Sequence, residues 1–381
     1  MSDSQLFKPL KVGDLDLQHR VVLAPLTRFK ADGEHVPLPM VSEYYSQRAS
    51  VPGTLLVSEA TFISKRAGGY PNVPGIWSSD QIEAWKDVTA KVHKKGSFIF
   101  LQLWALGRVA MPDVAKAEGF DIVSSSPTAL EIGDPVPREL TKGEIAQFVA
   151  DYAQAARNAI AAGFDGVEIH GAGGYLIDQF TQENCNMRND EYGGSVENRS
   201  RFLLEAVRAV VDAVGSEKVG LRLSPWQRYQ GMRMEDPVPQ FTHVISALNE
   251  LKLAYLHLIE ARVIGNDDGD DDDKINPFVD AWAGPGPVIL AGGFNPDSAK
   301  ALLEAEFKDK DILIAFGRHF ISNPDLPFRI RGGLKLTPYD RKVFYLPMVK
   351  EGYVDYPFSN EFQDYSVSYR LDRWLIGTKG L

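Results

Sequence analysis

Short apolar runs rich in β-branched residues alternate along the chain with longer segments of helical periodicity. This alternation is typical of βαβ units and a parallel sheet. Several runs are hydrophobic almost throughout, as expected for strands that helices cover. The eight candidate strands are Val21–Pro25, Thr54–Glu59, Ser97–Leu103, Gly166–His170, Val219–Leu223, Tyr255–Glu260, Val288–Ala291 and Ile312–Phe316. Eight such units predict a protein of the α/β class with a (β/α)8, or TIM, barrel.

Signals for the ends of helices lie between these runs. Thr141 and Glu144 have the spacing of a capping box, and Gly163 stands where that helix should end. A second helix is predicted from about Ser195 to Val214, where apolar residues form one stripe. Asn295, which precedes a proline, predicts the start of a third helix.

The chain of 381 residues is interpreted as one domain, because no repeat or low-complexity linker divides it. Residues 5–18 are predicted to form a short hairpin that caps the bottom of the barrel. Residues 104–140 are too many for a plain βα loop, so they predict an inserted lid after the third strand. The segment from about 364 to 381 has no clear place in the pattern.

Composition excludes several classes of function. The formal net charge of −10 argues against nucleic acid as a partner. No stretch approaches the roughly 20 apolar residues that cross a membrane. The single cysteine, Cys185, and the absence of an apolar signal segment at the start predict a cytoplasmic location. The acidic run from Asp267 to Asp273 is interpreted as a solvated loop and lacks the spaced ligands of a calcium loop.

Polar residues gather where the predicted strands end, which is where active sites of such barrels lie. Loops after strands seven and eight commonly bind a phosphate through backbone N–H groups, and Arg318 would add a fixed positive charge. Two glycine turns at these two places favour a phosphate site over ordinary turn chemistry. The residues at the strand ends are Thr27, Gln102, His170, Arg222, Gly292, Gly293, Gly317 and Arg318.

Four of the side chains near these ends have two readings each. Arg222 lies in an apolar strand and needs a partner, which is either a barrel carboxylate or an anionic cofactor. Gln102 is either an ordinary buried amide or a group that pairs with the edge of a heterocycle. His170 and Tyr175 are either structural or a carbonyl-binding donor with a proton donor.

Several motifs resemble those of a known family: Leu23–Arg28, Phe100–Arg108, Val167–His170 with Gly174–Phe180, Asp190–Phe202, Gly220–Pro225 and Gly317–Asp325. Together they resemble the Old Yellow Enzyme family of FMN-dependent ene reductases, and the fungal and other eukaryotic members most. The resemblance runs from about Leu6 to Phe362. It implies non-covalent FMN, NADPH as the reductant, and reduction of the carbon–carbon double bond of an enone or enal by ping-pong hydride transfer.

The resemblance also implies roles. Thr27 would contact the flavin C4 carbonyl, Gln102 its pyrimidine edge, and Arg222 would place positive charge near N1. His170 would bind the substrate carbonyl and Tyr175 would protonate the α-carbon. The rest of the cofactor site would be Pro25, Leu26, Ala60, Gly292, Gly293, Phe294, Gly317 and Arg318. The substrate cavity would be lined by His170, Gly173, Tyr175, Tyr70, Trp104, Phe294 and Tyr345.

One position departs from the family pattern, which has Asn or His where this chain has Gly173. A neutral donor to a developing enolate oxygen is worth roughly 2.7–4 kcal/mol in comparable sites, so a water or a backbone N–H would have to substitute in part.

Other functions therefore stay open. The same scaffold could catalyse isomerisation or act as a weak NADPH oxidase, and a flavoprotein could also serve as a binder or sensor. A barrel aldolase is disfavoured because no lysine stands at a predicted strand end. The sequence shows no convincing metal-ligand cluster, and it leaves open a monomer or a homodimer.

Overall fold

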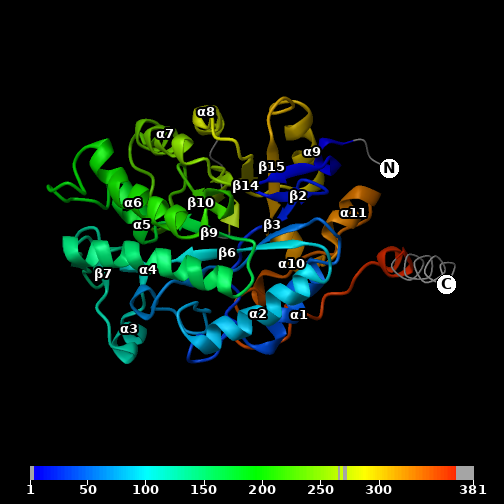
Figure 1. Ribbon diagram of the computed structural model, residues 1–381, viewed down its shortest axis with the longest axis horizontal. Coiled ribbons are helices and arrows are strands. Elements are labelled where there is room, and N and C mark those ends of the chain that lie inside the picture. Colours follow the sequence, from blue (N-terminus) through cyan, green and yellow to red (C-terminus); the bar gives the residue numbers. More distant parts are fainter. Residues whose placement is uncertain (1–3, 265–266, 269–272, 366–381) are drawn as a thin grey trace.

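A closed barrel of parallel strands forms the centre of the molecule in the computed structural model, which describes residues 4–264, 267–268 and 273–365 (Figure 1). Its eight strands are β3 (Val21–Leu23), β4 (Leu55–Val57), β6 (Phe98–Trp104), β9 (Gly166–Gly171), β10 (Val219–Leu223), β11 (Tyr255–Ile259), β14 (Val288–Ala291) and β15 (Ile312–Phe316). The sheet closes because β4 pairs with both β3 and β6. A two-residue strand, β5 (Thr61–Phe62), adds to the end of β6. The predicted barrel is confirmed.

The predicted strands are present, and they differ from the observed ones only at their ends. The bounds predicted for β10, β14 and β15 match the structure. The predicted first strand reached Pro25, whereas β3 ends at Leu23. Proline has no N–H to donate to a neighbouring strand, so the chain leaves the sheet just before it.

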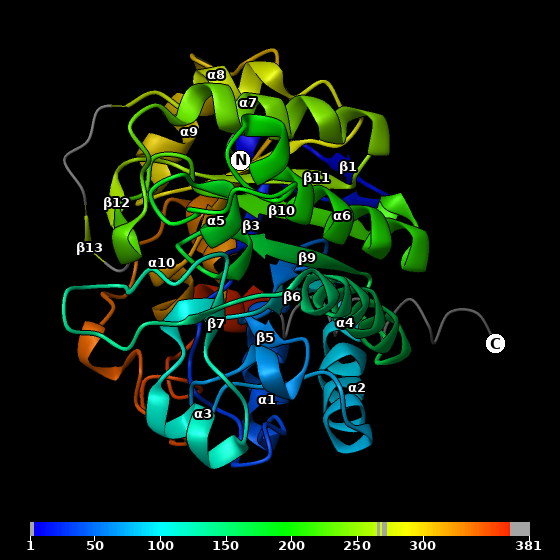
Figure 2. The ribbon, with the colours of Figure 1, turned by 90° about the vertical axis from the view of Figure 1, so that its left-hand side faces the viewer.

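Each barrel strand is followed by at least one helix, and these helices surround the barrel. Figure 2 shows α4, α6 and α7 outside the strands β6, β9 and β10. Thr141 and Glu144 form the predicted capping box at the start of α4, and Ser195 and Asn295 cap α6 and α9. Apart from two short helices described below, the α-helices of the described residues are α1 (Pro39–Arg48), α2 (Ser79–His93), α4 (Lys142–Ala161), α6 (Val196–Val214), α7 (Pro237–Leu248), α8 (Asn276–Ala281), α9 (Pro296–Glu304), α10 (Arg318–Ser322) and α11 (Leu326–Gly332).

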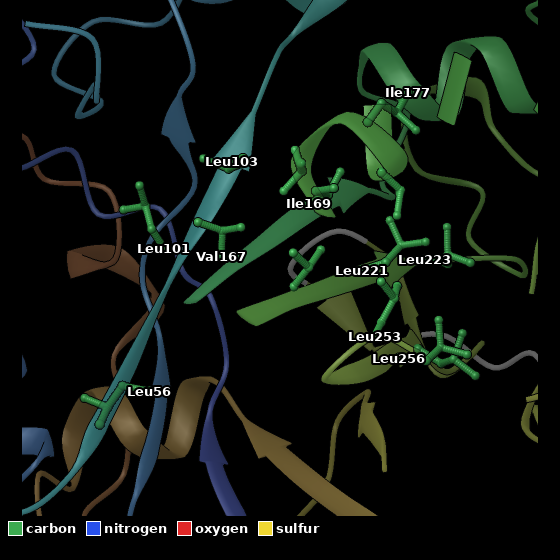
Figure 3. Close-up of a cluster of buried hydrophobic side chains, with 14 of the residues drawn as sticks. Leu56, Leu101, Leu103, Val167, Ile169, Ile177, Leu221, Leu223, Leu253 and Leu256 are labelled. Atoms are coloured by element: carbon green, nitrogen blue, oxygen red, sulfur yellow. The ribbon is translucent and has the colours of Figure 1, made fainter. Parts of the chain in front are cut away.

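Alternate residues of each strand point to opposite sides of the barrel wall. Leu101, Val167 and Leu221 belong to the main hydrophobic core, which packs between the strands and the helices (Figure 3). The residues between them face inward. Near the N-terminal ends of the strands these inner residues are apolar, as with Leu55 and Leu313. The lower part of the barrel is therefore a packed interior.

An antiparallel hairpin closes this lower end, as predicted for residues 5–18. It consists of β1 (Leu10–Val12) and β2 (Leu15–Leu17). Val12 and Leu17 are fully or almost fully buried, and they pack with the apolar residues inside the barrel. The hairpin thus continues the barrel core beyond the strands.

The segment 104–140 lies at the opposite end of the barrel from the hairpin (Figure 1). It contains the helix α3 (Pro112–Glu118) and two short paired strands, β7 (Val123–Ser124) and β8 (Arg138–Glu139). Leu106 packs in a cluster with Trp104 beside the C-terminal ends of the strands. That this segment acts as a lid stays a prediction, as does the single-domain interpretation.

Two predicted segments fall partly or largely outside the described residues. Asp267 and Asp268 form β13, which pairs with β12 (Val263–Ile264), and Asp273 makes an ion pair with Arg233 at 2.7 Å. Residues 269–272 and 366–381 lie outside the described part of the chain. In that described part, no helix is long and apolar enough to cross a membrane.

Candidate active site

A cavity of about 910 Å³ lies at the C-terminal ends of the barrel strands. Small inward residues at the ends of three neighbouring strands make room for it: Ala24, which follows β3, Ala291 on β14 and Ala315 on β15. The structure brings all of the predicted site residues to this cavity, while their roles stay predictions. These residues are Pro25, Leu26, Thr27, Ala60, Tyr70, Gln102, Trp104, His170, Gly173, Tyr175, Arg222, Gly292, Gly293, Phe294, Gly317, Arg318 and Tyr345.

His170 is held as a neutral imidazole with a defined proton. Its Nδ1 accepts a hydrogen bond from the backbone N–H of Ala172 at 3.3 Å, so the proton of the neutral ring lies on Nε2. Burial lowers the pKa of His170 well below 6.5, and the positive charge of Arg222 lowers it further. At neutral pH the ring therefore presents an N–H donor without carrying a charge.

Tyr175 lies beside His170, at the start of helix α5 (Leu176–Thr181). Its ring packs edge-on against Trp104 at 4.7 Å and His170 at 5.0 Å between centroids. Burial raises the pKa of Tyr175 well above 10, and the neighbouring Tyr70 raises it further. The phenol is therefore protonated at neutral pH, so it can give a proton to a bound molecule.

Gly173 has a left-handed backbone, with φ of +66°. Its N–H donates to Ser224 Oγ at 2.8 Å, and the next N–H, of Gly174, donates to Asp178 at 2.9 Å. Neither N–H is therefore the substitute donor that the sequence left open. A Cβ at position 173 would lie 3.3 Å from Tyr175 Cε2 and 3.8 Å from His170 Cε1, so a side chain there would enter the space between these rings.

Arg222 has no carboxylate partner within 4 Å among the described residues. The ion pair with a barrel carboxylate, which was one of the two interpretations of Arg222, is therefore not formed. Its Nε is buried without a hydrogen-bond partner. Gln102, 1% exposed, donates from Nε2 to Glu168 at 2.7 Å, which leaves its carbonyl oxygen as the acceptor. A cation on β10 and an amide acceptor on β6, two strands separated by β9, fit a flat, anionic heterocycle better than an apolar ligand.

The other end of the cavity contains the two glycine turns. Gly292 and Gly293 have φ of +140° and +63°, and a Cβ on Gly292 would lie 2.9 Å from the Cβ of Glu260. Arg318 begins α10, and its guanidinium lies over the ring of Tyr339 at 5.6 Å. The exposed backbone of Gly293 and a fixed cation fit a phosphate group such as that of FMN.

Several lining residues were missed by sequence reasoning. Ala24, Ala291 and Ala315 could have been found, because they occupy inward positions of predicted strands and are small. Tyr229 begins a single turn of 3₁₀ helix and Tyr339 lies in a loop, and such short segments have no periodicity that indicates the direction of a side chain. In the described part of the chain no group of three or more His, Cys, Asp or Glu side chains could hold a metal ion.

Comparisons with known proteins agree with this geometry. The family described as "NADH:flavin oxidoreductase / NADH oxidase family" matches residues 5–337. The "NADP-dependent oxidoreductase lnbE" of Aspergillus flavus is 57% identical over 95% of this chain and 98% of its own length. The "Chanoclavine-I aldehyde reductase fgaOx3" of Penicillium roqueforti is 55% identical over 94% and 98%.

A third relative carries a different description. The "Probable inactive reductase easA" of Epichloe festucae var. lolii is 54% identical over 95% of this chain and 97% of its own length. Among solved structures, Old Yellow Enzyme from Pichia sp. AKU4542 matches with a TM-score of 0.87 and 40% identity over 94% of both chains. The chain therefore belongs to the NADH:flavin oxidoreductase / NADH oxidase family and shares the fold of Old Yellow Enzyme.

Proposed function

We propose that the protein binds one FMN non-covalently and reduces the carbon–carbon double bond of enals and enones with NADPH. One observation carries the proposal: a neutral N–H donor, His170, and a protonated phenol, Tyr175, share one cavity with Arg222. Gln102 and Arg222 would hold the ring system, while Gly293 and Arg318 would hold the phosphate. Bound FMN would supply the hydride.

The chain's own residues then divide the remaining chemistry. His170 Nε2–H donates to the substrate carbonyl oxygen and polarises the conjugated double bond. As negative charge develops on that oxygen, this hydrogen bond strengthens, which stabilises the transition state more than the bound substrate. Tyr175 delivers its proton to the α-carbon, so the new C–H bonds form on both carbons of the double bond. Tyr70 and Trp104 limit access of water.

Names of relatives support the finer parts of the proposal. NADPH fits the relative named as an NADP-dependent oxidoreductase, and an aldehyde substrate fits the relative named as an aldehyde reductase. An aldehyde carbonyl is more electrophilic than a ketone, so it needs less help from a second donor at position 173. We therefore propose that the protein reduces enals in preference to enones.

A second function, isomerisation or weak NADPH oxidation on the same scaffold, is favoured by Gly173. Without a second side chain on the carbonyl oxygen, electrons would pass to the substrate more slowly. Some relatives are named as inactive enzymes, which agrees with a weakened site.

A visible spectrum of the purified protein tests the proposal. We expect a flavin spectrum, release of FMN on heating, loss of colour with NADPH without oxygen, and return of colour on addition of an enal. Recovery of FAD, or no flavin after reconstitution with FMN, would contradict the cofactor. Return of colour with oxygen but not with any enal or enone would favour the oxidase.

A further inference from the structure

A polar layer lies inside the barrel directly below the cavity, where most barrels have apolar side chains. It is formed by Gln102 on β6, Glu168 on β9, Arg222 on β10 and His257 on β11, which are adjacent strands. Glu168 and His257 are fully buried. Gln102 and Arg222 line the cavity, whereas Glu168 and His257 do not. Two members of the layer therefore stand behind the two that would touch a ligand.

Glu168 connects the members of this layer. One of its carboxylate oxygens accepts a hydrogen bond from Gln102 Nε2 at 2.7 Å, and the other accepts one from His257 Nδ1 at 2.8 Å. Register places Gln102 opposite Glu168 and Arg222 opposite His257. The ionised carboxylate can accept at both oxygens in this arrangement, and His257 then carries its proton on Nδ1.

Charges in the layer follow from this geometry. Burial opposes ionisation of Glu168, but His257, Arg222 and Gln102 outweigh it and lower the pKa of this carboxyl. Burial also lowers the pKa of His257, so its ring is neutral at pH 7 with the proton on Nδ1. The layer then contains one anion, Glu168, and one cation, Arg222. Among the described residues these two form no direct ion pair, so the attraction between them acts through space.

We propose that Glu168 is a positioning residue that tunes bound FMN in two ways, an inference that rests on the proposed function. It holds the Gln102 amide with its oxygen toward the cavity, where that oxygen can accept from a ring N–H. It also offsets the positive charge of Arg222 and so limits how strongly the site favours reduced flavin, which carries negative charge.

Replacing Glu168 by Gln tests the charge while keeping the shape. The new amide oxygen can accept from Gln102, and its NH₂ can donate to the other tautomer of His257. Without the negative charge, Arg222 acts unopposed, so the reduction potential of bound FMN should rise. We expect at least a tenfold shift of the equilibrium with a reference dye, which corresponds to about 30 mV for a two-electron couple.

His257→Asn is the matched control, because it replaces one neutral N–H donor to Glu168 by another. In this variant, the equilibrium constant between bound FMN and the reference dye should stay within about threefold of the wild-type value. A Glu168→Gln potential equal to or below that of the wild type, with FMN bound, would overturn the inference and leave the proposed function standing. Wild-type protein that takes up no FMN would overturn both.

Glu168→Asp is the alternative test of the positioning role if the Glu168→Gln variant does not fold. The shorter side chain keeps the charge but loses its reach to Gln102. FMN should then bind about tenfold more weakly, measured from the flavin fluorescence lost on binding, while the potential stays near the wild-type value. Unchanged affinity would overturn the positioning role.

Discussion

At the scale of single residues, Tyr175 and His170 each hold a proton that the surrounding protein has fixed. Burial keeps the phenol protonated, and the N–H of Ala172 directs the imidazole proton to Nε2. The two groups therefore serve as donors over the whole neutral range. Neither could act as a general base there without a change of environment.

Tyr175→Phe should separate the two halves of the catalytic cycle. Reduction of bound FMN by NADPH needs no proton from the phenol, so its rate should change less than threefold. Reoxidation by an enal should slow by about 10²–10⁴, the usual contribution of a general acid. Stopped-flow absorbance measures both steps. Equal slowing of the two would assign Tyr175 a structural role.

Gly173→Asn should strengthen binding at the carbonyl position. The backbone has φ of +66°, which Asn tolerates better than most residues, but the new Cβ lies 3.3 Å from Tyr175 and must displace it slightly. We expect about tenfold tighter binding of para-substituted phenols and faster reduction of small enals, with less gain for bulky ones. Titration by the long-wavelength charge-transfer band measures this.

Gly173→Ala is the control for this change, because it adds the Cβ and the backbone strain without the amide. It should bind phenols no better than the wild type. If the Asn variant also leaves the dissociation constant and the band unchanged, residue 173 does not face the substrate oxygen.

At the scale of elements, His19 joins the hairpin to the barrel. Its Nδ1 accepts from the N–H of Val21 in β3 at 3.2 Å, and its Nε2 lies 3.0 Å from Thr54 Oγ1. Burial, together with the positive charge of Arg331, lowers the pKa of His19 to about 4. A protonated ring would turn an N–H toward the N–H of Val21, so this contact requires the neutral form.

Acid should therefore weaken the connection that His19 makes between the hairpin and the barrel. Because the pKa of His19 is lower in the folded than in the unfolded state, its contribution to stability is complete above pH 6.5 and is lost as the pH falls toward 4. At 1.36 kcal/mol per pH unit, the loss is about 3 kcal/mol. Urea unfolding across this range should show that fall relative to His19→Asn. Parallel curves for the two proteins would contradict it.

The strands were predictable because inward and outward faces impose a period that the sequence must obey. Hydrophobic runs such as Val219–Leu223 and Ile312–Phe316 predicted strands with correct bounds. Arg222 and Gln102 stood out because a polar side chain within a buried apolar run needs an interaction partner. The placement of Tyr229 and the hydrogen bond of Gly173 to Ser224 could not be predicted, since they depend on how irregular loops fold onto one another.

At the scale of the whole molecule, FMN should act as part of the folded structure. A ligand that binds only the folded state stabilises it by about 2.7 kcal/mol at 100 times its dissociation constant, which predicts a rise in Tm of roughly 3–5 °C for a chain of this size. Scanning fluorimetry at a fixed heating rate measures the rise.

Riboflavin provides the control ligand, because it has the same ring system and lacks the phosphate. At the same concentration it should raise the Tm less than FMN does. Arg318→Ala should remove most of the difference between the two ligands. Equal shifts with FMN and riboflavin in the wild-type protein would contradict a phosphate site at the two glycine turns.

The hairpin under the barrel also determines how molecules pass through the site. Val12 and Leu17 fill the lower end together with the apolar interior, while the cavity lies at the other end of the strands. Reductant and acceptor would then enter and leave through the same opening of the cavity, one at a time. Raising the concentration of either one beyond its optimum would block the other, so turnover should pass through a maximum as each is increased.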